Sequence, residues 1–199
     1  MVGSNFSNIK EIKEYALAEN IPIIQDDGLS FLTNFILKND IKKVLEIGTA
    51  IGYSAIMMAI TCPNVSIVTI ERDEKRYLEA VKNVKKMNLE DRITLIFKDA
   101  LEVKLEKEFD LIFIDAAKSQ STRFFKSFEK NLTSRGYIIT DNMNFHGYVL
   151  KKEEEIKSKN LRALVRKIKD YKEFLINNEK YETNFYDTGD GISVSRKKK

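Results

Sequence analysis

Short apolar runs alternate with segments of helical periodicity along most of the chain. The runs with the length and composition of buried strands are 41–47, 67–71, 93–97, 109–115 and 136–141. Between them, apolar residues recur three and four positions apart, which is typical of helices that pack one face on a sheet. The alternation predicts an α/β fold, a mainly parallel sheet with helices on both faces.

The N-terminal segment precedes this alternation. Apolar positions after Ser7, a candidate N-cap, predict one helix, and Asp26 and Asp27 can begin a second. No linker or repeat separates this segment from the rest. We therefore expect residues 1–199 to form a single domain, in which 1–40 is a helical cap.

The C-terminal segment has a different order of elements. A long basic helix is predicted over 152–178, followed by strands over 181–186 and 192–195. A glycine-rich turn at 189–191 joins these two strands. Because the turn is short, the strands should form an antiparallel hairpin at one edge of the sheet.

A glycine turn follows the first strand and precedes a helix, a position where nucleotide-like ligands bind. It contains Gly48 and Gly52 but lacks the spacing of a dinucleotide fingerprint and the lysine of a P-loop. Glu46 precedes the turn, and Glu71 ends the next strand, where an acid commonly bonds ribose hydroxyls. This combination favours S-adenosylmethionine (SAM) over NAD or a nucleoside triphosphate. The alternative is a structural turn without a ligand.

Polar residues at the ends of later strands predict a metal site. Asp115, Asp141 and Asn142 follow two strands that can be neighbours in the sheet. Three hard oxygen donors suit Mg²⁺, with Ca²⁺ or Mn²⁺ as alternatives. Lys118 can reach the same cleft and act as a base, and His146 can line its mouth. The alternatives are a helix cap, a turn and surface side chains.

Composition excludes several classes of protein. One cysteine and one histidine exclude an internal disulfide and disfavour a zinc site built from these residues. No apolar run has the length of a membrane span, and residues 1–10 lack a signal-peptide pattern. A cytoplasmic protein without membrane contact is expected.

The charge is unevenly distributed. The net charge is +4, and the segment 151–172 carries nine Lys or Arg against four acids. The last four residues, 196–199, are all basic. These two segments permit a polyanionic partner such as RNA, or they form a solvated helix face and a frayed tail.

Five motifs follow one another over about 45 to 195: LEIGTAIGYSA, IERDE, FDLIFIDAAKSQ, GYIITDNMNFHG and GDGISVS. Together they resemble the cation-dependent O-methyltransferases related to catechol and caffeoyl-CoA methyltransferases. Within that family the chain looks most like the bacterial tRNA 5-hydroxyuridine methyltransferases. The resemblance implies a Rossmann-like seven-stranded SAM-methyltransferase sheet and a homodimer.

The resemblance also implies roles for individual residues. The implied metal ligands are Asp115, Asp141 and Asn142, and the implied base is Lys118. The implied cofactor-binding residues are Ile24, Glu46, Gly48, Ser54, Glu71, Asp99, Ala100 and Asp115. Ile24 would close over the cofactor, and the stretch 23–28 around it differs from the family pattern.

The function implied is Mg²⁺-dependent transfer of a methyl group from SAM to the 5-hydroxyl of 5-hydroxyuridine, at the wobble position in a tRNA anticodon loop. One alternative is O-methylation of small catechol-type or caffeoyl-CoA-like substrates. Two others are an NAD-dependent oxidoreductase, which the missing fingerprint disfavours, and a SAM-binding protein without catalysis, which the acids and Lys118 disfavour.

Overall fold

The computed structural model describes the backbone of residues 2–198 and the side chains of residues 6–198. Its strands form one sheet of seven, in the order β3-β2-β1-β4-β5-β7-β6. The strands are β1 (Lys43–Ile47), β2 (Ser66–Glu71), β3 (Ile93–Phe97), β4 (Phe109–Ile114), β5 (Leu132–Thr140), β6 (Tyr181–Tyr186) and β7 (Ile192–Lys197). β1 to β5 are parallel, and β7 runs antiparallel to β5 and β6. The predicted fold is confirmed, including the C-terminal hairpin.

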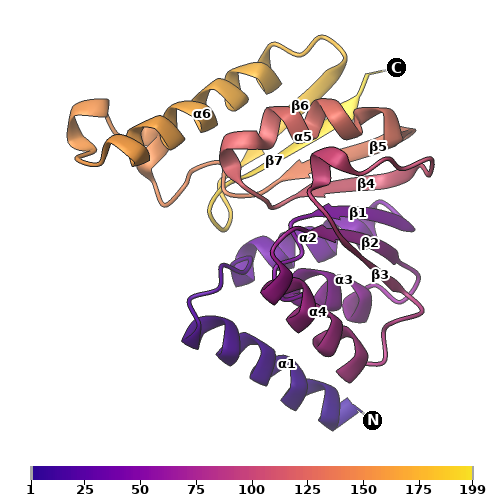
Figure 1. The fold of residues 1–199 in the computed structure, drawn as a ribbon. Helices are drawn as coiled ribbons and strands as arrows, with labels where there is room; N and C mark the ends of the chain where they lie inside the picture. Colours follow the sequence, from indigo (N-terminus) through magenta and orange to yellow (C-terminus); the bar gives the residue numbers. More distant parts are fainter. Residues whose placement is uncertain (1, 199) are drawn as a thin grey trace.

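Helices cover both faces of this sheet (Figure 1). They are α1 (Val2–Ala18), α2 (Asp26–Lys38), α3 (Tyr53–Thr61), α4 (Glu74–Lys86), α5 (Ser121–Phe128) and α6 (Lys159–Ile176). One apolar cluster joins α1 to α4 to one face of the strands, and a second joins α5 and α6 to the other face. The parallel strands β1 to β5 contribute to both clusters because successive side chains point to opposite faces.

Two predicted helix starts are wrong. Ser7 lies inside α1, which begins at Val2, and its hydroxyl contacts Glu11 on the next turn. The basic helix begins at Lys159 instead of 152, because Ser158 accepts a hydrogen bond from the Leu161 N–H and caps it. Before that cap, the only helical pieces described between 141 and 158 are the short 3₁₀ turns η4 (Tyr148–Leu150) and η5 (Glu153–Glu155).

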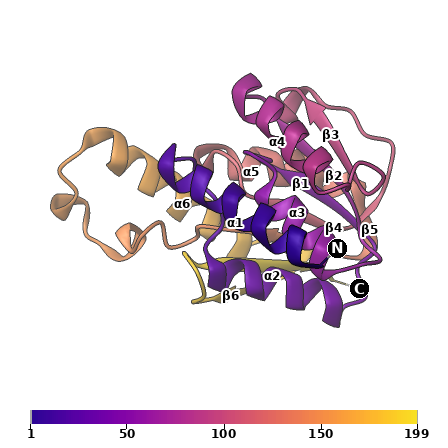
Figure 2. The ribbon, with the colours of Figure 1, turned by 90° about the horizontal axis from the view of Figure 1, so that it is seen from below.

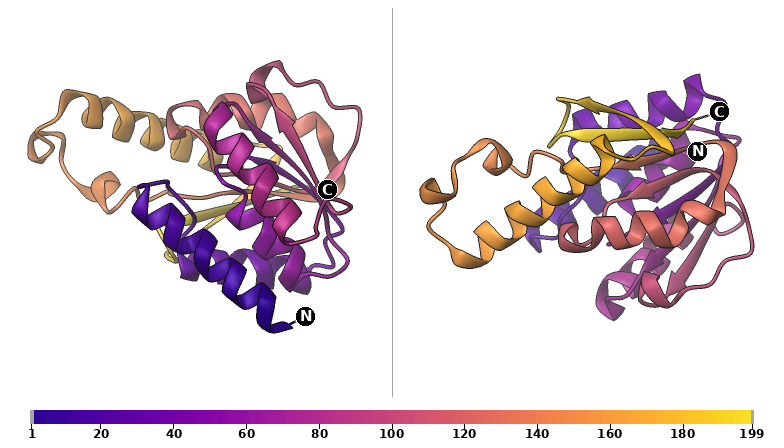
Figure 3. Two further views of the ribbon diagram at one scale, coloured as in Figure 1. Left: turned by 60° about the horizontal axis from the view of Figure 1, so that its bottom comes forward. Right: turned by 90° about the horizontal axis from the view of Figure 1, so that it is seen from above.

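The connection between β5 and α6 projects away from the sheet (Figures 2 and 3). It begins at the carboxyl end of β5 and returns through α6, which packs beside the 3₁₀ turn η2 (Lys118–Gln120). The basic segment therefore lies next to the carboxyl edge of the sheet. Within residues 2–198, no helix has the length and apolar character needed to cross a bilayer.

Candidate functional site

A cavity of about 550 Å³ opens at the carboxyl edge of the sheet. Its walls come from the carboxyl ends of β1 to β5 and the loops that follow them, where open parallel sheets bind ligands. The predicted site residues that line it are Ile24, Gly48, Ser54, Glu71, Asp99, Ala100, Asp115, Lys118, Asp141 and Asn142. His146 also lines it. The fold thus brings together residues from distant parts of the chain.

The glycine turn has a conformation that only glycine adopts without strain. Gly48 has φ +102°, and a Cβ there would lie 2.7 Å from the carbonyl carbon of Asp115. Gly52 has φ +85° and precedes the first residue of α3. The turn therefore allows β1 to lie against β4 and points the N-terminus of α3 toward the cavity. The N–H groups of that first helical turn can face a ligand.

Glu71 is fixed in the wall of the cavity by three backbone donors. Its Oε2 accepts the Ala50 N–H at 2.8 Å, and its Oε1 accepts the N–H groups of Arg72 and Asp73 at 2.9 Å. The residue is only 8% exposed. A carboxylate held in this way keeps acceptor capacity on both oxygens for hydroxyl donors in the cavity.

Asp99 forms the next part of the wall. Its side chain accepts the Leu101 N–H at 2.9 Å and a bond from Arg72 Nη1 at 3.2 Å. The Leu101 N–H bond and the Arg72 guanidinium hold the pKa of this carboxyl below its ordinary value. Ala100 follows it and is buried. A small apolar residue beside a charged acceptor provides a flat surface with one polar edge, which suits an adenine ring.

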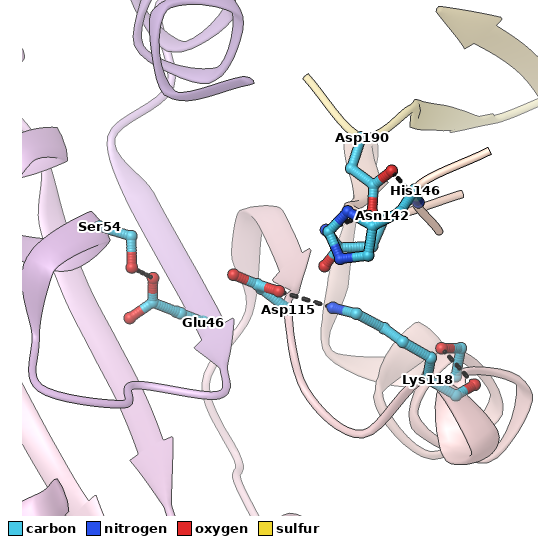
Figure 4. A network of polar contacts seen from close by, with 8 residues as sticks. Glu46, Ser54, Asp115, Lys118, Asn142, His146 and Asp190 are labelled. Carbon is cyan, nitrogen blue, oxygen red and sulfur yellow. Dashed lines mark hydrogen bonds and ion pairs between the residues drawn. The ribbon is translucent and has the colours of Figure 1, made fainter. Parts of the chain in front are cut away.

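Glu46 is the predicted cofactor residue that does not line the cavity. It is fully buried, and its carboxyl accepts bonds from Ser54 Oγ at 2.6 Å and Thr69 Oγ1 at 2.5 Å. Burial raises its pKa to about 8, although these two bonds oppose the shift. Ser54 lines the cavity, and Figure 4 shows its bond to Glu46. Glu46 therefore does not face the cavity itself, but it bonds Ser54, which does.

Asp115, Asp141 and Asn142 converge where β4 and β5 end side by side. Asp141 is 2% exposed, and burial together with the charge of Asp115 raises the pKa of its carboxyl. Asn142 has a left-handed backbone, φ +60°, and it lines the cavity beside Asp141. Within residues 2–198, no cluster of three or more His, Cys, Asp or Glu side chains could hold a metal ion. The predicted ligands contain only two such side chains, Asp115 and Asp141, and the third donor is the amide of Asn142.

This donor set fits a hard divalent cation. Asp141 Oδ1 is buried and has no hydrogen-bond partner, which is costly unless another group satisfies it. Two carboxylates that repel each other are also neutralised by a cation between them. Oxygen donors without sulfur or imidazole favour Mg²⁺, Ca²⁺ or Mn²⁺.

Lys118 contacts the same cluster. Its Nζ donates to Asp115 Oδ1 at 2.6 Å, and the two side chains are 15% and 19% exposed (Figure 4). The 3₁₀ turn η2 that carries Lys118 directly follows the Asp115 loop. An amine fixed at the cavity wall in this way can exchange a proton with a bound hydroxyl.

Sequence reasoning missed two parts of the site. Arg72, Arg76 and Lys98 add positive charge to the Asp99 side of the cavity, but isolated basic residues in loops carry no distinguishing pattern. Asp190 lies in the predicted turn 189–191 and bonds the Asn142 loop. Its position between two glycines indicated a turn, whereas its contacts depend on how the hairpin packs.

Most cations of the segment 151–172 are exposed. Arg166 pairs with Glu153 at 3.1 Å, and the side chains of Lys152, Lys157 and Lys159 face solvent. These three lysines lie on the connection that leads from the cavity edge at Asn142 out to the first turn of α6. Of the basic tail, residues 196–198 are described, whereas Lys199 lies outside the described residues.

Comparison with known proteins identifies relatives across almost the whole chain. A family described as O-methyltransferase matches residues 5–198. A Staphylococcus aureus structure described as a "putative caffeoyl-CoA O-methyltransferase" has TM-score 0.90 and 38% identity, covering 96% of this chain and 92% of that one. A Bacillus cereus O-methyltransferase in complex with SAH has TM-score 0.80 and 26% identity, covering 96% and 91%. The caffeoyl-CoA O-methyltransferase of Populus kitakamiensis is 27% identical over 193 residues, which cover 93% of this chain and 82% of that protein.

Proposed function

This chain belongs to the O-methyltransferase family, and from that premise we propose that its acceptor is 5-hydroxyuridine at the wobble position of tRNA. The chain is a SAM-dependent O-methyltransferase of the caffeoyl-CoA and catechol type. The proposed product is 5-methoxyuridine. The acceptor offers two adjacent oxygens, the 5-hydroxyl and the 4-carbonyl, as a catechol does with its two hydroxyls.

The observation that carries the tRNA proposal is the position of the basic segment. Lys152, Lys157 and Lys159 are exposed on the connection from β5 to the first turn of α6, and this connection begins at the carboxyl edge of the sheet where the cavity opens. Phosphate groups are bound mainly by Lys and Arg, and a base in an anticodon loop can leave the stack to enter a pocket. A small phenol needs no such surface outside the cavity.

The wall of the cavity would bind SAM along its length. Glu71 would accept hydrogen bonds from the ribose hydroxyls, and Asp99 with Ala100 would border the adenine. Gly48 and Ser54 would line the methionine end, with Glu46 supporting Ser54 from behind. Ile24, which is 4% exposed and lines the cavity, would exclude water above the cofactor.

The acceptor would bind in the cavity beside Lys118 and the acidic cluster. Asp115, Asp141 and Asn142 would hold Mg²⁺, with Ca²⁺ or Mn²⁺ as alternatives. When bound, the cation would stabilise negative charge on the acceptor oxygens as a Lewis acid. Lys118, once it has given up its own proton, would take the proton of the acceptor hydroxyl, and its contact with Asp115 supports this role. Holding the reacting groups in line would provide much of the acceleration.

A second candidate function is O-methylation of a small catechol-type or caffeoyl-CoA-like substrate. The name of the Populus kitakamiensis relative supports it. The same cavity and the same residues would serve either acceptor, since the chemistry requires only two adjacent oxygens. The cations beside the cavity would then contact solvent or the phosphates of CoA.

The experiment compares acceptors directly. Labelled SAM and Mg²⁺ are supplied with tRNA from cells that lack this enzyme, and in parallel with a catechol and with caffeoyl-CoA. We expect label in 5-hydroxyuridine of the tRNA. Label only in the small acceptors would overturn the tRNA proposal and establish the second candidate.

Charge variants sharpen this test. Replacing Lys152, Lys157 and Lys159 by alanine should weaken tRNA binding and reduce its salt slope by roughly 2, at about 0.7 per phosphate contact. The matched control replaces Lys43, Lys107 and Lys130, which are exposed at the opposite edge of the sheet. Equal effects of the two triple variants would show that only net charge matters.

Two further expectations accompany the proposal. The protein should be cytoplasmic, where tRNA is modified, and it should form a homodimer, as the resemblance implies. Light scattering of the purified protein measures its mass in solution, and a monomeric mass would contradict the dimer.

A further inference from the structure

Asp190 connects the β6–β7 turn to the loop that carries Asn142. It is buried, with a side chain 4% exposed. Its Oδ2 accepts a bond from Asn142 Nδ2 at 3.2 Å, and its Oδ1 accepts the backbone N–H of His146. Its backbone carbonyl accepts the Asn144 N–H at 2.8 Å. A single residue of the hairpin therefore bonds three positions of the loop.

The loop that Asp190 contacts is strained. Asn142, Phe145 and His146 all have positive φ, between +44° and +60°. Each such conformation costs an L residue about 1 kcal/mol or more, so bonds from outside the loop must hold it. Those bonds come from the hairpin, and a Cβ at Gly191 would lie 2.7 Å from Asn144 Cγ. The turn and the loop are packed against each other with no room for a side chain.

The bond to Asn142 determines which end of its amide is available. An amide has a donor end and an acceptor end, and Asp190 occupies the donor end. The oxygen is thereby left for the site formed by Asp115 and Asp141. Figure 4 shows Asn142 between Asp190 and the Asp115–Lys118 pair.

We infer that Asp190 is a positioning residue, which orients the Asn142 amide so that its oxygen faces the cation site. This inference rests on the proposed role of Asn142 as a metal ligand. It does not depend on the methyl acceptor. Without Asp190, the amide could rotate and present its NH₂ group to the cation, which would repel it.

The experiment measures cation binding by the full-length protein without an acceptor. Mn²⁺ is the probe, and its affinity is determined by titration calorimetry for wild type and Asp190→Asn. Loss of such a supporting bond typically weakens metal binding 10- to 100-fold, so we expect at least about a 10-fold weaker Mn²⁺ affinity. SAH affinity should stay within about twofold, because Glu71 and Asp99 are untouched. The matched control is Asp187→Asn, which alters an exposed bond to Asn144 in the same turn.

A double-variant cycle separates positioning from a general structural role. In an Asn142→Ala background, Asp190→Asn should cause no further loss of Mn²⁺ affinity, because Asp190 would act through Asn142. Three results would overturn the inference: additive losses, unchanged Mn²⁺ affinity in Asp190→Asn, or equal losses of Mn²⁺ and SAH affinity. A wild type that binds no Mn²⁺ would also overturn it. The acceptor comparison tests tRNA separately.

Discussion

The hydroxyl of Ser54 donates to the carboxyl of Glu46 at 2.6 Å, behind the wall of the cavity. The other carboxyl oxygen meets Thr69 Oγ1, which in turn lies 2.6 Å from Thr49 Oγ1. Either threonine can donate in that last contact, so the chain of hydroxyls can serve a protonated or an ionised Glu46. This network fixes Ser54 and Thr49, which line the cavity.

Replacing Glu46 by glutamine should make the protein more stable than wild type at high pH. Burial raises the pKa of Glu46 from 4.5 to about 8, so the folded protein binds this proton more tightly than the unfolded chain. The favourable contribution is complete below about pH 4.5 and is lost as the pH rises toward about 8, at a slope of up to about 1.4 kcal/mol per pH unit. An amide can keep both hydrogen bonds without ionising.

Urea unfolding at pH 5, 6.5 and 8 measures this difference. The free energy of unfolding of wild type should fall relative to Glu46→Gln across the series. Glu106→Gln, an exposed change in the β3–β4 connection, is the control and should follow wild type. Parallel pH profiles for wild type and Glu46→Gln would contradict the prediction.

Gly48→Ala should remove SAM binding and destabilise the fold. The φ of +102° alone costs alanine about 1–2 kcal/mol, and the added methyl group would collide with the backbone of Asp115. Thermal unfolding and SAH calorimetry measure the two effects. Gly147→Ala is the control, because its φ of +76° has a similar cost but a Cβ there meets nothing within 4 Å. If both variants bind SAH normally, the close contact with Asp115 is unimportant.

The sequence predicts the fold well because the strands are short apolar runs that end at glycine or acid. Gly48 and Asp115 mark strand ends by their residue types alone, and both lie at the cavity. Contacts between segments far apart in the chain could not be predicted. The bonds of Asp190 to the 142–146 loop depend on how the hairpin packs, and the burial of Glu46 depends on Thr69 of the neighbouring strand.

Helix starts show the same limit. The sequence of the basic segment predicts a helix that starts upstream of Ser158, whereas the helix in the structure begins only after it. Arg162 Nη1 bonds the Ile156 carbonyl at 2.6 Å, and Ile156 is buried, so the chain turns back before the helix begins. Tertiary contacts thus determine where α6 begins, whereas the local sequence pattern alone predicts a helix that is too long.

Asp141→Asn should abolish cation-dependent turnover and leave SAM binding intact. The variant keeps the size of the side chain, but it removes the charge that a divalent cation requires, and the SAM-facing residues are unchanged. We expect at least about a 100-fold loss of the Mg²⁺-stimulated rate, as for other essential metal ligands. The control is Asp170→Asn on the exposed face of α6. If the Asp141→Asn variant in EDTA were as active as wild type with Mg²⁺, the metal role would be refuted.

Lys118→Ala should lower kcat by about 10²-fold or more, the usual contribution of a positioned general base, with little change in SAH affinity.

The Lys118→Arg variant distinguishes two roles for this side chain. Arginine keeps the positive charge beside Asp115, but it does not release a proton in this pH range. If Lys118 is the base, the arginine variant should be as slow as the alanine variant. If it only neutralises Asp115, the arginine variant should approach the wild-type rate. Single-turnover rates with saturating SAM measure this difference, since they report the chemical step without product release.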